Sequence, residues 1–315
     1  MHAFHYKPRT GLSFAHERTV LNLFQTMGLP EKLVSRLTAM DINEPTPIQT
    51  HAIPHALNGK DVMGLAQTGT GKTAAFGLPL IAQMMASSQK LEPKSVRGLI
   101  LAPTRELAKQ ISDNLKGFVQ NTPIKIGLVV GGASINPQIA RVARGIDILV
   151  ATPGRLIDLL DRRALSLHAT TFLVLDEADQ MLDLGFIHSL RKISGMLPKT
   201  RQTMLFSATM PKQMNELANS YLQNPMRVEV SPPGKAADKI TQSIHFISKA
   251  EKTKLLIELI DKHRDELALV FSRTKHGAEK LMKTLDKSGF SVTSVHGNKS
   301  QGQRERALKS FRAGE

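Results

Sequence analysis

Residues 171–179, TFLVLDEAD, limit the possible folds of this chain most narrowly, because a short apolar run leads directly into a cluster of carboxylates. A run this short and this apolar is typical of a buried parallel strand. Open sheets of alternating strands and helices bind their ligands beyond the carboxyl ends of the strands. Asp176, Glu177 and Asp179 therefore fall where a ligand is expected, and hard carboxylate oxygens there suit a metal ion.

Other short apolar segments before residue 231 repeat this arrangement and end in polar or glycine-containing clusters. Because the strands of a parallel sheet share one direction, these clusters are expected along one edge. Helical stretches separate the segments, which predicts an α/β domain with a parallel sheet covered by helices on both faces. The predicted strands are 62–66, 99–102, 125–130, 148–151, 171–175, 203–206 and 227–230.

The same alternation predicts the domain organisation. Residues 1–19 lack clear periodicity and form a basic N-terminal extension, and residues 20–230 form the first domain. Residues 231–237, SPPGKAA, have the composition of a linker. Residues 238–315 form an incomplete second α/β domain. Its predicted strands are 242–247, 267–271 and 291–295, and its predicted helices lie near 252–263, 275–288 and 302–311.

Composition favours a polyanionic partner, because 42 Lys and Arg against 27 Asp and Glu leave a net charge of +15. With 0 Cys, the chain has neither a disulfide framework nor a thiolate metal site, which suits a reducing cytoplasm. No apolar run approaches the roughly 20 residues that a membrane-spanning helix needs. We therefore expect a cytoplasmic protein without a membrane partner.

A glycine-rich turn, QTGTGKT, follows the predicted strand 62–66 and leads into a predicted helix. Backbone N–H groups at such a helix start bind phosphate, the Lys72 ammonium can neutralise the β and γ phosphates, and the Thr73 hydroxyl can ligate Mg²⁺. Ala66 stands where the general motif has its first glycine, so the turn alone fits a plain glycine turn equally well. The acid cluster at another strand end favours a nucleotide triphosphatase.

Two carboxylates supply what phosphoryl transfer requires of acids. Asp176 is positioned to hold hydrated Mg²⁺, and Glu177 to orient and deprotonate the attacking water. A lone Asp-Glu pair is more often a solvated turn after a strand, but the phosphate-binding turn reverses that preference.

Five ordered motifs, QTGTGKT, PTREL, TPGR, DEAD and SAT, resemble the DEAD-box family of ATP-dependent RNA helicases, and the resemblance covers residues 24–315. The wording HGNKSQ at residues 296–301 is similar to the bacterial RhlE-type group. The resemblance implies two RecA-like domains, ATP and Mg²⁺ as cofactors, and ATP-driven local separation of RNA strands. It also implies a monomer that binds RNA mainly through the sugar-phosphate backbone.

The resemblance also implies residue roles. Gln49 would read the adenine edge and Phe24 would stack on the ring, although Phe24 fits an ordinary core aromatic as well. The implied nucleotide-binding residues are Phe24, Gln49, Gln67, Thr68, Gly69, Thr70, Gly71, Lys72 and Thr73. The implied RNA-binding residues are Thr104, Arg105, Gly132, Thr152, Arg155, Arg273, Gln301 and Arg304. The resemblance also implies that three residues couple the state of the bound nucleotide to the affinity for RNA. These residues are Asp179, Ser207 and Thr209.

Two motifs of the second domain in that family, R-G-x-D and H-R-x-G-R-x-G-R, do not occur after Val270. Residues 144–147, RGID, imitate the first motif but precede a predicted strand of the first domain. Because arginine fingers contribute about 10³–10⁵ in turnover, we expect a chain truncated within the second domain, with hydrolysis near background. The alternative is a catalytically inactive fragment that binds nucleotide and RNA. A DNA-directed motor fits the adenine-reading and DEAD motifs less well.

Overall fold

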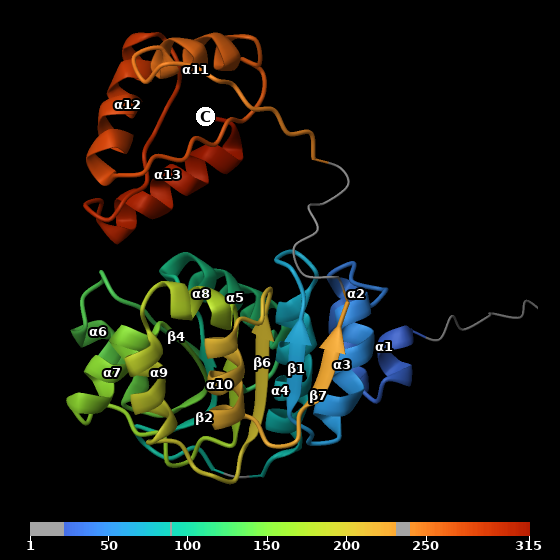
Figure 1. Ribbon diagram of the computed structural model, residues 1–315. Coiled ribbons are helices and arrows are strands. Elements are labelled where there is room, and N and C mark those ends of the chain that lie inside the picture. Colours follow the sequence, from blue (N-terminus) through green and yellow to red (C-terminus); the bar gives the residue numbers. More distant parts are fainter. Residues whose placement is uncertain (1–21, 89, 231–239) are drawn as a thin grey trace, which may run out of the picture.

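The computed structural model describes residues 22–88, 90–230 and 240–315 (Figure 1). The first domain is built on one seven-stranded sheet in the order β3-β4-β2-β5-β6-β1-β7, and every pair of neighbours is parallel. The predicted parallel sheet is therefore confirmed. The strands are β1 (Val62–Leu65), β2 (Val96–Leu101), β3 (Ile126–Val129), β4 (Ile146–Ala151), β5 (Phe172–Leu175), β6 (Gln202–Ser207) and β7 (Met226–Glu229).

The inner strands are apolar along their whole length because both faces of the sheet are covered. In β2, Leu99 and Leu101 point into one hydrophobic core, while Ile100 between them points into the other. This alternation follows from the two-residue side-chain period of a strand. Residues 144–147 lead into β4, where the Asp147 carboxylate pairs with the Arg97 guanidinium, so this RGID sequence belongs to the first domain as predicted.

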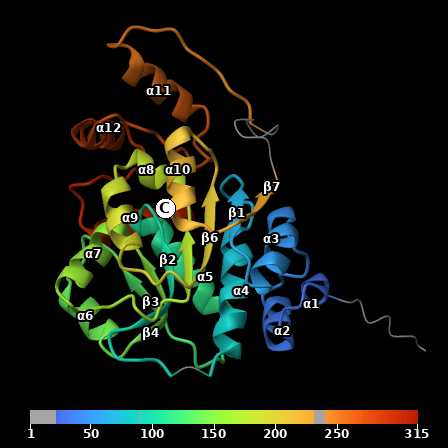
Figure 2. The same ribbon diagram turned by 60° about the horizontal axis from the view of Figure 1, so that its bottom comes forward.

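Helices form a layer on each face of the sheet (Figures 1 and 2). Residues of α1 to α5 contribute to one core and residues of α6 to α10 to the other. The first layer comprises α1 (Leu23–Thr26), α2 (Glu31–Ala39), α3 (Pro47–Leu57), α4 (Lys72–Ala86) and α5 (Arg105–Phe118). The second comprises α6 (Asn136–Val142), α7 (Pro153–Asp161), α8 (Ala178–Asp183), α9 (Ile187–Ser194) and α10 (Lys212–Tyr221).

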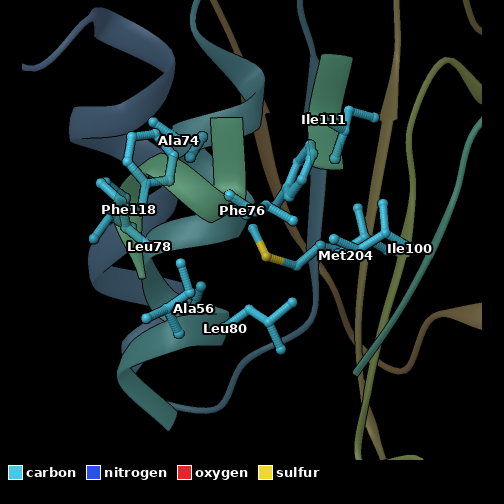
Figure 3. Packing of buried hydrophobic residues seen from close by; sticks show 14 of the residues in the cluster. Ala56, Ala74, Phe76, Leu78, Leu80, Ile100, Ile111, Phe118 and Met204 are labelled. Carbon is cyan, nitrogen blue, oxygen red and sulfur yellow. The ribbon is translucent and has the colours of Figure 1, made fainter. Parts of the chain in front are cut away.

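Helix α4 is the helix that the phosphate-binding turn enters, and it is packed tightly against the sheet. Phe76 and Leu80 from α4 lie against Ile100 and Met204 from the strands, all of them fully buried (Figure 3). Truncating a buried phenylalanine to alanine typically costs about 3–5 kcal/mol. This packing fixes the first turn of α4 relative to the ends of the strands.

The C-terminal segment contains helices but no sheet, which contradicts the three strands predicted there. Residues 240–315, all of which the structure describes, include α11 (Lys252–Asp261), α12 (Lys275–Lys287) and α13 (Gln301–Ala313) and no strand. Phe246 and Phe271, each within a predicted strand, are 94% and 89% exposed. A strand is stable only when neighbouring strands satisfy its backbone and other elements cover its faces. None of the three segments pairs with another strand, and the two that contain Phe246 and Phe271 are largely uncovered.

We expect residues 240–315 to be the less stable part, because only Leu285 and Ala307 of their apolar side chains are buried. Brief proteolysis should degrade this segment first and leave the first domain as the resistant product. Mass spectrometry of the time course checks this order. A C-terminal fragment that outlasts residues 22–230 would contradict it.

Two predicted boundaries, the extension 1–19 and the linker 231–237, lie outside the described residues. No helix within the described ranges is long and apolar enough to cross a membrane.

Candidate functional site

The loops that carry the predicted nucleotide site follow three neighbouring strands. The glycine-rich turn comes after β1, the DEAD sequence after β5, and Ser207-Ala208-Thr209 at the end of β6. Strand β6 lies between β5 and β1, so the three loops gather at the carboxyl edge of the sheet.

The glycine-rich turn requires glycine at two positions. Gly69 and Gly71 have φ angles of 85° and 90°, a region that residues with a side chain rarely adopt. A Cβ atom on Gly71 would also collide with the Gln49 Nε2 atom and the Thr46 side chain. Gly71 is the residue that caps α4, so its conformation directs the first N–H groups of the helix into the turn.

Lys72 and Asp176 form a buried pair at the centre of the site. Their exposed fractions are 6% and 2%, and Lys72 Nζ lies 3.8 Å from Asp176 Oδ1. Lys72 Nζ also donates to the Ala66 carbonyl at 3.3 Å. Burial raises the pKa of Asp176 to about 6, and the Lys72 charge opposes part of that rise. The carboxyl group therefore ionises within the physiological range.

Glu177 joins the acid cluster to the glycine-rich turn. Its backbone lies in the left-handed region, with φ and ψ of 52°, and its N–H donates to Asp176 Oδ1 at 3.1 Å. The Thr68 hydroxyl donates to Glu177 Oε1 at 3.2 Å. The two loops predicted to act together are thus in direct contact.

The donor set fits a cation that is completed by a ligand. Among the described residues, no group of three or more His, Cys, Asp or Glu side chains could hold a metal ion. Mg²⁺ in phosphate-transferring proteins takes one or two protein oxygens and fills its remaining positions with water and phosphate. Asp176 is buried at the strand end and Thr73 lies in the first turn of α4, so both match that need.

Gln49 is buried beside the glycine-rich turn. Its Oε1 accepts from the Thr46 N–H at 3.0 Å, and its Nε2 donates to the Gly71 carbonyl at 3.0 Å. A glutamine amide has two N–H bonds and two acceptor lone pairs, so one donor and one acceptor remain. That remainder matches the bidentate pairing of a glutamine with the adenine N6 and N7 atoms.

Phe24 does not lie where the stacking role requires it. Its side chain is 0% exposed and packs in the hydrophobic core with residues of α2, α3 and α4. A ring with no accessible face cannot stack on a base, so in this structure Phe24 is a core aromatic.

Asp179, Ser207 and Thr209, the predicted coupling residues, are brought together. Asp179 Oδ2 accepts from the Thr209 N–H and the Thr209 hydroxyl, each at 2.9 Å. The Ser207 hydroxyl donates to the Thr209 carbonyl at 2.7 Å. The DEAD loop is therefore bonded directly to the loop after β6.

Most of the predicted RNA-binding residues line one pocket of about 430 Å³ on the same edge, among the loops after β2, β3 and β4. Arg105 lies against Gly132, where an added Cβ would collide with the guanidinium. Arg273 is exposed and does not line this pocket. The lining residues are Pro103, Thr104, Arg105, Glu106, Gly131, Thr152, Gly154, Arg155, Phe186 and Arg304.

Helix α13 contributes Arg304 to the lining of this pocket and makes two polar contacts with α5. Arg304 Nη2 lies 2.8 Å from Glu106 Oε1, and Arg105 Nη1 donates to Gln301 Oε1 at 3.5 Å. Glu106 was not among the predicted site residues, and its position in the first turn of α5 is an ordinary one for an acidic residue. Its ion-pair partner, Arg304, comes from α13.

Sequence reasoning also missed the capping role of Thr46. Thr46 and Gln49 form a capping box at the start of α3. The signal was present, because a threonine followed three residues later by glutamine is a known helix start.

Comparison with known proteins places these loops in a family context. A family model described as DEAD/DEAH box helicase matches residues 46–217, and one described as Helicase conserved C-terminal domain matches residues 251–315. The first match contains the glycine-rich turn, the acid cluster and the pocket residues before α13.

Two curated relatives are helicases. The chain is 42% identical over 298 residues to RNA helicase CrhR of Synechocystis sp., a match that covers 94% of this chain and 59% of the relative. It is 39% identical over 315 residues to DEAD-box ATP-dependent RNA helicase 52A of Oryza sativa subsp. japonica, covering 92% and 52%. The chain thus spans between half and three fifths of the length of these relatives.

A solved structure shares the architecture. The crystal structure of a DEAD box protein from the hyperthermophile Methanococcus jannaschii matches with a TM-score of 0.60 and 33% identity. The match covers 92% of this chain and 77% of that chain. The predicted RecA-like fold is confirmed.

Proposed function

Because this chain belongs to the DEAD/DEAH box helicase family, we propose that it binds ATP·Mg²⁺ and RNA and couples them in local RNA strand separation. The observation that carries the proposal is the Asp179–Thr209 contact, which links the loop of the acid cluster to the next strand end. The nucleotide loops and the arginine-lined pocket lie on one edge of one sheet.

In the proposed reaction, Lys72 neutralises phosphate charge and the N–H groups at the start of α4 hold the phosphate oxygens. Glu177 orients the attacking water and accepts its proton, and the Thr68 hydroxyl holds that carboxylate in place beforehand. When bound, Mg²⁺ supplies charge stabilisation to the phosphates, and Asp176 and Thr73 are the residues that would hold it.

Adenine selectivity is assigned to Gln49, because its remaining donor and acceptor match the N7 acceptor and N6 donor of adenine, whereas guanine offers acceptors at both N7 and O6. Gln49 is joined to the glycine-rich turn by its hydrogen bond to the Gly71 carbonyl. Gln67, Gly69 and Thr70 complete the proposed nucleotide site, and the Thr70 hydroxyl donates to the Gln67 carbonyl at 2.8 Å.

RNA is proposed to lie across the pocket with its phosphates facing Arg105, Arg155 and Arg304. Thr104, Gly132, Thr152 and Gln301 belong to the same proposed path, and Arg273, which does not line the pocket, is proposed to join it from outside. Contacts to phosphate and sugar position RNA without reading its bases. We further propose a cytoplasmic monomer of the RhlE-type group.

Binding to single-stranded RNA is expected to be insensitive to base sequence and to weaken steeply with salt. Arg105→Ala should weaken binding at least about tenfold, since a charge-assisted hydrogen bond contributes about 1.5–3 kcal/mol. Fluorescence anisotropy with RNAs of scrambled sequence at several salt concentrations measures both effects.

Arg227→Ala is the matched control, because Arg227 is exposed on β7, the strand at the far side of the sheet from β2, β3 and β4, and pairs with Glu229 in its own strand. It should leave RNA affinity unchanged. Strong discrimination between scrambled sequences, or unaltered affinity in Arg105→Ala, would overturn the proposed RNA site.

A further inference from the structure

A buried glutamine holds both ends of the loop that presents Gly132. Gln138 on α6 is 5% exposed, and its Oε1 accepts from the Val130 N–H at 3.0 Å. Its Nε2 donates to the Val130 carbonyl and to the Ser134 carbonyl, each at 3.1 Å. Both N–H bonds of the amide are therefore used, one at each end of the loop.

The loop between these two ends is exposed and presents unpaired donors. Within the described part of the chain, the backbone N–H groups of Gly131, Gly132 and Ala133 have no protein acceptor. Gly132 has a φ of 75°, and successive N–H groups in such a conformation form a concave anion site. Arg105 lies against the same glycine, so the loop combines backbone donors with a cation.

A second residue supports the loop from the other side. The Arg155 guanidinium donates twice to the Ala133 carbonyl, at 3.0 and 3.1 Å. Arg155 lies on α7 and lines the pocket, so these two bonds tie the loop to a residue of the proposed RNA site. The loop is thus held at Val130, Ala133 and Ser134, and the N–H groups of residues 131–133 stay available to a ligand.

The alternative role for Gln138 is to stabilise α6 alone. That helix has only seven residues, and the Gln138 amide makes none of its hydrogen bonds within it. A side chain that serves the helix would bond to its first or last turn. All three bonds instead end on the loop 130–134.

We propose that Gln138 is a positioning residue for RNA binding, which sets the loop 131–134 in the conformation that receives an RNA phosphate. This inference rests on the proposed RNA-binding function. A loop ordered before binding loses less conformational entropy when the ligand arrives, so the glutamine contributes affinity without touching RNA.

The test uses Gln138→Ala and Gln138→Met in the full 315-residue chain. Affinity for a single-stranded RNA should fall about tenfold in both variants, which corresponds to about 1.4 kcal/mol. Amide hydrogen exchange at Val130 should accelerate at the same time, because its N–H loses its acceptor. Affinity for ATP·Mg²⁺ should not change, since the glycine-rich turn lies on other strands.

Gln202→Ala is the matched control. Gln202 is also buried, and its Nε2 donates to the carbonyls of Ala56 and Lys60 at 2.8 and 2.7 Å, at the start of β6 and therefore at the opposite edge of the sheet. This variant should lower the unfolding temperature without a selective loss of RNA binding. All affinities are measured at least about 15 °C below the lowest unfolding temperature of the variants. Every variant is then folded, so differences in stability do not alter the measured RNA affinity.

The outcomes separate this inference from the proposed function. If Arg105→Ala weakens RNA binding but both Gln138 variants bind as the parent does, the positioning role is overturned and the RNA site stands. If neither Arg105→Ala nor the Gln138 variants alter binding, the RNA site itself is wrong. Equal losses in Gln202→Ala and Gln138→Ala would assign Gln138 to general stability and overturn the inference.

Discussion

Lys72→Ala is expected to weaken binding of ATP·Mg²⁺ by at least about 100-fold, since hydrogen bonds to charged groups contribute about 1.5–3 kcal/mol each and the ammonium faces two phosphates. The loss includes a second effect, because Asp176 would be left as a buried carboxyl without its cation. Titration with a fluorescent adenine nucleotide measures the affinity.

Lys109→Ala is the control for this variant. Lys109 is an exposed lysine on α5, paired with Asp113 in the next turn, and it has no part in the nucleotide site. Its loss should not alter nucleotide affinity. Nucleotide binding by Lys72→Ala that is as tight as that of the parent would show that the ammonium does not contact the phosphates.

Asp176→Asn is expected to lose Mg²⁺-dependent nucleotide binding. Its free energy of unfolding is also expected to increase relative to that of the parent chain as pH rises. The carboxyl pKa is raised by burial from 3.8 to about 6. The folded state therefore holds a proton that the unfolded state releases at lower pH. The stability that this carboxyl contributes is complete below pH 3.8 and is lost as pH rises through about 6.

From about pH 2.5 to about pH 8 the parent should lose about 3 kcal/mol of unfolding free energy relative to Asp176→Asn, because a pKa difference of one between the folded and unfolded states is worth about 1.36 kcal/mol. Urea unfolding of both chains at several pH values gives this difference, from which all other titrating groups cancel. Asp183→Asn, an exposed carboxylate on α8, controls for the removal of a charge. A stability difference between the parent and Asp176→Asn that stays constant with pH would contradict the buried, partly neutral carboxyl.

The first domain was predictable because its signals are local. Each inner strand is a short apolar run between loops, so β5 and its carboxylates could be recognised from residues 171–179 alone. The common direction of parallel strands then predicted that the loops after β1, β5 and β6 meet. The contacts of Thr68 with Glu177 and of Asp179 with Thr209 follow from that edge.

What the sequence did not predict depends on partners distant in the chain. The sequence around Phe24 is the same whether its ring stacks on a base or fills a core. Only the packing against α2, α3 and α4 decides between these two roles. The apolar runs after residue 240 look like strands, but strand formation needs neighbours that a local pattern cannot supply. Gln138 is the exception, because its partners at residues 130 and 134 are near in the chain, yet no sequence pattern marks a glutamine that bonds to the loop before its helix.

The Arg304–Glu106 pair also has a consequence for how RNA binding would respond to ionic strength. RNA that binds Arg304 has to break this ion pair first, which leaves the Glu106 carboxylate close to an RNA phosphate of the same charge. The release of counterions belongs to the RNA strand, at about 0.7 of a counterion for each phosphate neutralised, and a lone carboxylate on the protein does not condense them again. Arg304 would therefore count fully in the salt dependence of RNA binding while contributing less to the affinity than an unpaired arginine.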